Sequence, residues 1–99
     1  MPNQQIIVTA HLKVKSGMEE QFKQEYLPIV TLTIAEEGCI NYSLHQSHND
    51  ASLFMLYEKW TSKEVLDRHL QMPYVQAANG KASEFLAEPV EMNLWEEIS

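Results

Sequence analysis

The chain has 99 residues, which suits one domain, and its net charge of -7 argues against nucleic acid and anionic membranes as partners. Its one cysteine, Cys39, excludes an intramolecular disulfide, and no apolar run could span a bilayer. We therefore expect a single domain over residues 1–99. The first residues lack the features of a signal peptide, which favours a cytoplasmic location. A chain of this size buries only about two-thirds of its unfolded surface, so we expect a homodimer.

The first half of the chain alternates between strand and helix patterns. Residues 6–14 place their apolar side chains on one face, as a strand does. A helix is predicted from Met18 to about Glu37, with Ser16 and Glu19 as a capping box. Pro28 lies inside this helix and is expected to kink or split it. Gly38 is the expected left-handed cap.

The second half predicts a hairpin, two short helices and a last strand. Strands are expected at 40–45 and 53–60, joined by turn residues at 47–50. Thr61 and Glu64 form the pattern of a second capping box, opening a helix that ends at Met72–Pro73. A further helix is expected over 74–86, and the last strand over 90–95.

The order β-α-β-β-α-β, with the second helix in two pieces, is the ferredoxin-like split β-α-β pattern of an α+β fold with a four-stranded antiparallel sheet. Helices cover one face of such a sheet. The other face is too apolar to be fully solvated, and pairing with the same face of a second copy would cover it. Its residues are Ile7, Thr9, His11, Asn41, Ser43, Leu53, Met55, Tyr57 and Trp95.

Polar groups occur where this pattern predicts a core. Alternate strand residues share a face, and one helix stripe is expected to pack on it. The strand face carries Phe54, Leu56, Glu58 and Trp60, and the helix stripe carries Val65, Leu66, His69 and Leu70. Glu58, Trp60 and His69 would then converge in a largely apolar space, which is typical of a small-molecule pocket walled by side chains such as Phe54 and Leu66.

These residues suggest acid–base chemistry on an aromatic ligand. His69 has the imidazole of a general base, and Glu58 could orient it or act as the base itself. Trp60 would provide a flat wall, and Tyr42 or Tyr57 a hydrogen bond to an oxyanion. His45 and His48 fall on opposite faces of a strand and have no partner ligand, so no metal site is expected. Acidic pairs such as Glu36–Glu37 are interpreted as solvated.

Several of these stretches resemble one protein family. They are Lys-Ser-Gly at 15–17, Glu-Glu-Gly-Cys-Ile-Asn-Tyr at 36–42, and Phe-x-Leu-Tyr-Glu-Lys-Trp at 54–60 followed by His69 and Pro73. Together they resemble the antibiotic biosynthesis monooxygenase (ABM) domain. The resemblance implies a dimeric α+β barrel that oxidises a quinol or polyphenol with O2, without a metal, flavin or haem cofactor.

The resemblance also suggests site residues. Glu58, Trp60 and His69 match positions associated with function in the family, and Tyr42, Asn41 and His11 match further ones. One departure is that family members often carry Pro-His where this chain has Pro73-Tyr74. We therefore do not assign to this chain any role that in the family needs this second imidazole.

Three other functions fit the same pattern. An isomerase or lyase acting on a small ketose phosphate, like the enzyme that processes phosphorylated autoinducer-2, would use Glu58 and His69 to move protons and would need a cation for the phosphate. Haem binding or degradation would need His69 free to ligate iron. A non-catalytic barrel would bind a small aromatic ligand, or would have its pocket filled by side chains such as Phe22, Phe54 and Phe85.

Overall fold

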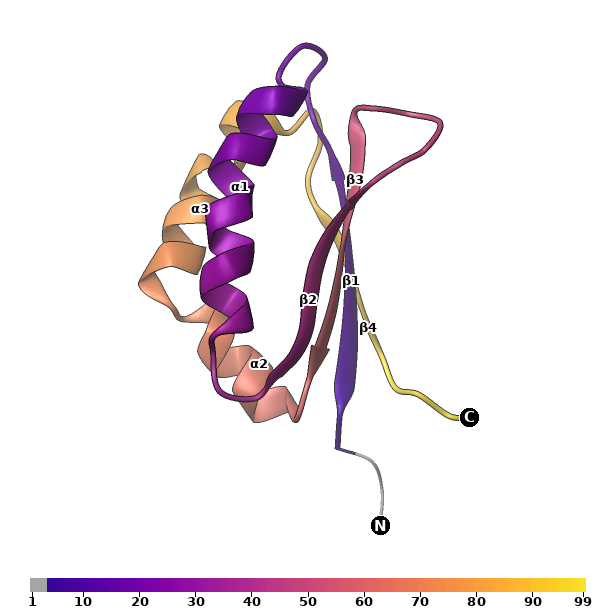
Figure 1. Cartoon of the computed structure of the whole chain (residues 1–99), viewed down its shortest axis with the longest axis vertical. Coiled ribbons are helices and arrows are strands. Elements are labelled where there is room, and N and C mark those ends of the chain that lie inside the picture. Colours follow the sequence, from indigo (N-terminus) through magenta and orange to yellow (C-terminus); the bar gives the residue numbers. More distant parts are fainter. Residues whose placement is uncertain (1–3) are drawn as a thin grey trace.

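Four strands pair into one antiparallel sheet in the computed structural model, which describes residues 4–99. The elements in chain order are β1 (Ile6–Lys13), α1 (Glu19–Ile34), β2 (Cys39–Gln46), β3 (Leu53–Trp60), α2 (Lys63–Leu70), α3 (Pro73–Phe85) and β4 (Glu91–Trp95). The strand order is β2-β3-β1-β4, and all three helices lie against one face of the sheet (Figure 1). The ferredoxin-like α+β fold is thereby confirmed.

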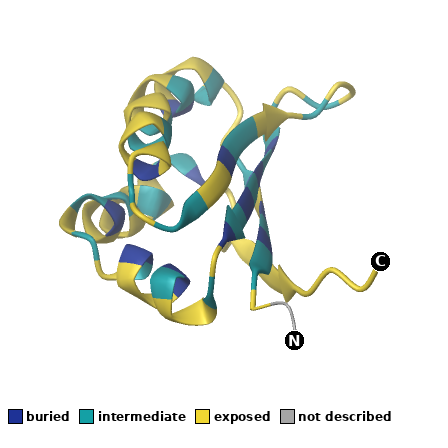
Figure 2. Cartoon of the chain, turned by 60° about the horizontal axis from the view of Figure 1, so that its bottom comes forward, coloured by how far each residue is buried: buried dark blue, intermediate teal, exposed yellow. Residues whose placement is uncertain are grey.

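The alternation of the strands separates a helix-covered face from an uncovered face. Tyr42 pairs with Glu58, and Leu56 pairs with Ala10, on the face that the helices cover. Figure 2 shows buried segments where the central strands face the helices, whereas β4 and the C-terminal residues are exposed. The buried apolar residues are Val8, Ala10, Leu12, Val14, Phe22, Tyr42, Phe54, Leu56, Trp60, Leu66, Val75 and Leu86.

Helix α1 runs through Pro28 without interruption, so of the two effects expected of this proline, a kink or a split, the split is wrong. Pro28 lies on the exposed side of the helix, where the loss of one backbone hydrogen bond is tolerated. Phe22 and Thr33, which are both buried, hold α1 against the core on either side of the proline.

Neither predicted capping box forms. The N-cap of α1 is Met18, and the Glu19 carboxylate accepts a hydrogen bond from the amide of Gly17 instead. At α2 the cap is Ser62, one residue later than expected, and its hydroxyl accepts from the Val65 amide. Both predictions placed the start of the helix to within one or two residues. The remaining shift arises because several neighbouring polar residues can each cap a helix.

The turn between α1 and β2 brings α2 close to the end of α1. Gly38 has φ +89°, the left-handed conformation predicted for it. The prediction that it caps the helix is wrong, because α1 ends at Ile34 and its C-cap is Ala35. A β-carbon at this position would lie 2.5 Å from Cγ1 of Val65, so only glycine lets α2 approach so closely. The Gly38 carbonyl also accepts a hydrogen bond from the Thr61 amide. This close approach places His69, at the end of α2, beside the end of α1.

Among residues 4–99, the structure contains no helix long and apolar enough to cross a membrane.

Candidate active site

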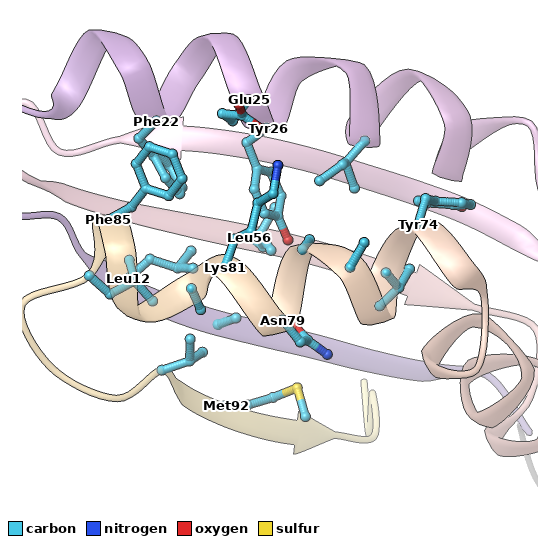
Figure 3. Close-up of a pocket in the computed structure, with 18 of the residues that line it drawn as sticks. Leu12, Phe22, Glu25, Tyr26, Leu56, Tyr74, Asn79, Lys81, Phe85 and Met92 are labelled. Atoms are coloured by element: carbon cyan, nitrogen blue, oxygen red, sulfur yellow. The ribbon is translucent and has the colours of Figure 1, made fainter.

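A cavity of about 270 Å³ lies between α1, α3 and the helix-covered face of the sheet. Figure 3 shows Phe22 and Tyr26 from α1, and Asn79, Lys81 and Phe85 from α3, around this space. Most of its lining is aliphatic or aromatic. Its polar lining residues are Glu25, Tyr26, Tyr42, Glu58, His69, Tyr74, Asn79 and Lys81. An apolar cavity with a few polar groups on its wall is the usual form of a small-molecule site.

The cavity is open rather than filled by aromatic side chains. Phe22 and Phe85 form part of its wall, with ring centroids 6.3 Å apart, while Phe54 packs behind Phe22 in the core. Ligand sites commonly have volumes of about 300 to 1,000 Å³, so this cavity is at the small end. It suits a ligand of one or two rings better than a large macrocycle such as haem.

His69 is buried and lines the cavity from the last turn of α2. Its Nδ1 lies 2.8 Å from Oε2 of Glu36, which follows the end of α1. The imidazole packs beside the Trp60 ring, with centroids 4.6 Å apart, and at 5.6 Å from the Tyr42 ring. Because Nδ1 is engaged by Glu36, Nε2 is the nitrogen that remains available to a ligand.

Glu58 is a second buried polar group on the cavity wall, with 5% of its surface exposed. One carboxyl oxygen accepts a hydrogen bond of 3.0 Å from Nε1 of Trp60. Burial raises the pKa of Glu58 to about 7, the Trp60 hydrogen bond opposes this rise, and the charge of Glu36 adds to it. The carboxyl can therefore gain or lose a proton near neutral pH.

A pair of phenols completes the polar wall. The hydroxyl oxygens of Tyr26 and Tyr42 are 3.2 Å apart, so one donates a hydrogen bond to the other. Burial is the main cause that raises the pKa of both phenols above its ordinary value of 10, and the nearby Glu58 charge adds to this rise. Both hydroxyls consequently keep their protons at neutral pH, and the phenol that accepts within the pair can donate its proton to a ligand.

The structure brings together four of the predicted site residues. Glu58, His69 and Tyr42 line the cavity. Trp60 is fully buried behind Glu58 and His69 and is not part of the cavity wall, where it was predicted to contact the ligand. Glu58 and His69 make no hydrogen bond to each other within the described part of the chain. The imidazole is oriented by Glu36 instead.

The remaining predicted residues lie elsewhere. Phe54 and Leu66 are core residues behind the cavity wall. His11, Asn41 and Tyr57 belong to the uncovered face of the sheet, as their strand register requires. His11 borders a separate, shallow hollow of about 240 Å³ on that face. These three side chains cannot reach a ligand in the main cavity of the same protomer.

Sequence reasoning missed three residues that are connected to His69 through hydrogen bonds, namely Glu36, Tyr74 and Thr33. Glu36 was interpreted as solvated, but its side chain is only 10% exposed. Tyr74 donates a hydrogen bond to Oε2 of Glu36, and its oxygen lies 3.3 Å from Oγ1 of Thr33. The available signal was a carboxylate close to a helix end beside Gly38, where a tight turn returns the chain toward the core.

No group of three His, Cys, Asp or Glu side chains is arranged to hold a metal ion within residues 4–99.

Comparisons with known proteins identify close similarities over nearly the whole chain. Residues 5–87 match the sequence model of a family described as "Antibiotic biosynthesis monooxygenase". An uncharacterized Synechocystis protein is 30% identical over 91% of this chain, which spans 61% of that relative's length. YcnE of Bacillus subtilis, whose name proposes a monooxygenase, is 29% identical over 88% of this chain and 92% of its own.

Solved structures share the fold. The crystal structure of a conserved protein from Methanosarcina mazei superposes with a TM-score of 0.92 at 25% identity, covering 97% of this chain and 95% of that one.

Proposed function

Because the chain belongs to the antibiotic biosynthesis monooxygenase family, we propose that it oxidises a small quinol or polyphenol with O2. The observation that carries this proposal is the pair of proton-accepting groups, His69 and Glu58, on the wall of an apolar cavity. Its volume of about 270 Å³ supports a substrate of one or two rings.

The proposed reaction needs no electrons beyond those of its two substrates. A quinol anion passes one electron to O2, and the two radicals combine to form a ring hydroperoxide. Loss of water from that hydroperoxide leaves a hydroxyquinone. One oxygen atom therefore enters the ring, the other leaves as water, and the two hydrogens of that water are the two that the quinol gives up.

The protein's part is to form the electron-rich anion and to keep water away from the radicals. His69 would accept the phenolic proton at Nε2. Of the hydrogen-bonded phenols Tyr26 and Tyr42, the one that accepts within the pair would donate its own proton to the resulting oxyanion. Glu58, with a pKa near 7, would relay the second proton as the hydroperoxide loses water. The apolar lining from α1 and α3 would exclude solvent from the radical pair.

The test is O2 uptake by the purified protein with benzohydroquinone and naphthohydroquinone. His69→Gln is expected to lower the turnover rate by about 100-fold, as loss of a general base does. His11→Ala, which removes an imidazole from the uncovered face, is the matched control and should retain the wild-type rate. Equal rates in wild type and His69→Gln would show that His69 is not the base.

One observation favours a second candidate, an isomerase or lyase acting on a ketose phosphate. Lys81 lines the cavity from α3, so a cation for a phosphate is within reach. The mostly apolar lining supports this reaction less well. Calorimetric titration with dihydroxyacetone phosphate would show saturable binding that Lys81→Met weakens about tenfold, as loss of one charge-assisted hydrogen bond should. Absence of binding to the wild type would remove this candidate.

A further inference from the structure

Three helix ends meet at one largely buried carboxylate beside the proposed base. Glu36 follows the end of α1, His69 lies in the last turn of α2, and Tyr74 lies in the first turn of α3. Oε2 of Glu36 contacts Nδ1 of His69 at 2.8 Å and accepts a hydrogen bond from the Tyr74 hydroxyl. Thr33, which is fully buried, adds its hydroxyl at 3.3 Å from the Tyr74 oxygen.

The number of protons on each group determines which group donates in each hydrogen bond of this network. A phenol carries a single proton, and that of Tyr74 goes to Glu36, so Thr33 must donate to the Tyr74 oxygen. An ionised carboxylate only accepts hydrogen bonds, so Nδ1 of His69 must carry the proton shared with Oε2 of Glu36. Nε2 is then unprotonated in the neutral ring, which is the form a general base requires.

The position of Glu36 is unfavourable for a residue that only ties helices together. A carboxylate close to the C-terminal end of a helix is destabilised by the helix dipole, and burial of its charge adds a further cost. Hydrogen bonds from His69 of α2 and Tyr74 of α3 offset these costs. A neutral acceptor would connect the same helices without the charge. The negative charge of Glu36 would stabilise His69 if His69 becomes an imidazolium during the reaction.

We propose that Glu36 is a positioning residue that holds His69 in its Nδ1-protonated tautomer, and that Tyr74, supported by Thr33, holds Glu36 in place. The role in turnover rests on the proposed function of His69. The effect on the tautomer does not, because it is a property of the ligand-free protein.

The tautomer can be read by long-range ¹H–¹⁵N NMR on protein with ¹⁵N-labelled histidine, at a pH where the rings are neutral. His69→Gln assigns the signal, and His11, His45 and His48 serve as internal references. The wild type should show His69 protonated at Nδ1. Glu36→Met removes the acceptor and keeps the side-chain length, so protonation should move largely to Nε2.

Tyr74→Phe is the matched structural control. It breaks the connection between α3 and α1 but leaves the contact between Glu36 and His69. It should keep the Nδ1-protonated form. A purely structural network predicts instead that both variants lose stability and that neither changes the tautomer. A wild-type ring protonated at Nε2 overturns the proposal, even if Glu36→Met does not fold.

Turnover supplies the second readout. With an active quinol, Glu36→Met should lower kcat by at least about tenfold, because both the tautomer and the imidazolium lose support, while KM changes little. If His69 proves essential for turnover and Glu36→Met changes neither kcat nor the tautomer, this inference alone fails. If no quinol is oxidised but the tautomer responds, the proposed function fails and the positioning role stands.

Discussion

Two carboxyl groups flank the candidate site in different environments, Glu58 fully within the core and Glu36 largely buried at its edge. Glu36 accepts hydrogen bonds from His69 and Tyr74, which stabilise its charge. Glu58 accepts one hydrogen bond from Trp60, and burial dominates, so its pKa rises to about 7.

The raised pKa of Glu58 makes the stability of the fold depend on pH. The carboxyl has a pKa of about 7 when folded, against an ordinary value of 4.5, so the folded chain retains a proton that the unfolded chain releases between these values. Stability therefore falls as pH rises from about 4.5 to 7. The expected loss between pH 5 and pH 8 is about 2 to 3 kcal/mol.

Urea unfolding at pH 5 and pH 8 measures this effect. Glu58→Gln should lack the loss, so its stability relative to the wild type should improve by that amount at the higher pH. Glu84→Gln, which removes an exposed carboxylate of α3, is the control and should follow the wild type. Parallel pH profiles for wild type and Glu58→Gln would contradict the raised pKa.

At the scale of elements, the site depends on how closely α2 packs against the turn after α1. Gly38 permits this contact by its positive φ and by its missing side chain. The contact brings His69 to Glu36, which lies only two residues before Gly38. Packing of α2 at this turn is therefore coupled to the orientation of the imidazole.

Gly38→Ala is expected to destabilise the fold by about 2 to 4 kcal/mol. The left-handed backbone is strained for a residue with a β-carbon, and that β-carbon would overlap the side chain of Val65. Gly17→Ala is a matched control, since Gly17 has φ +90° but no atom within 4 Å of an added β-carbon. It should cost only about 1 to 2 kcal/mol. Thermal or urea unfolding separates the two, and equal losses would mean that the contact with α2 contributes nothing.

At the scale of the whole molecule, the helices cover one face of the sheet and leave the other open. Trp95 remains 52% exposed there, although its indole donates a hydrogen bond to Thr9. Neighbouring positions on this face include Ile7, Met55 and Tyr57. Apolar surface of this extent on a small domain generally has a partner, and a second copy of the chain presents the same surface.

We expect sedimentation at twice the chain mass of 11.4 kDa. Tyr57→Lys places a charge at the centre of the open face and should yield monomers. Leu27→Lys, at a residue of α1 that is 53% exposed on the helix side, should leave the assembly unchanged. A wild-type protein that sediments as a monomer at every concentration would contradict the dimer.

Much of this architecture could be predicted from the sequence by itself. Alternation of apolar residues predicted every strand, and therefore placed Glu58 and Tyr42 on the buried face and His11 on the other. The helical stripe predicted that His69 faces inward. These predictions succeed because the periods of strands and helices are local properties of the backbone.

Only the tertiary structure decided which groups meet at the site. Glu36 and His69 are 33 positions apart, and Glu36 and Tyr74 are 38 apart, so no periodicity relates them. Their contact depends on the packing of α1, α2 and α3, set by the close approach at Gly38. A surface carboxylate and a buried one look alike in a sequence, because burial is decided by the neighbours that the fold brings to each side chain.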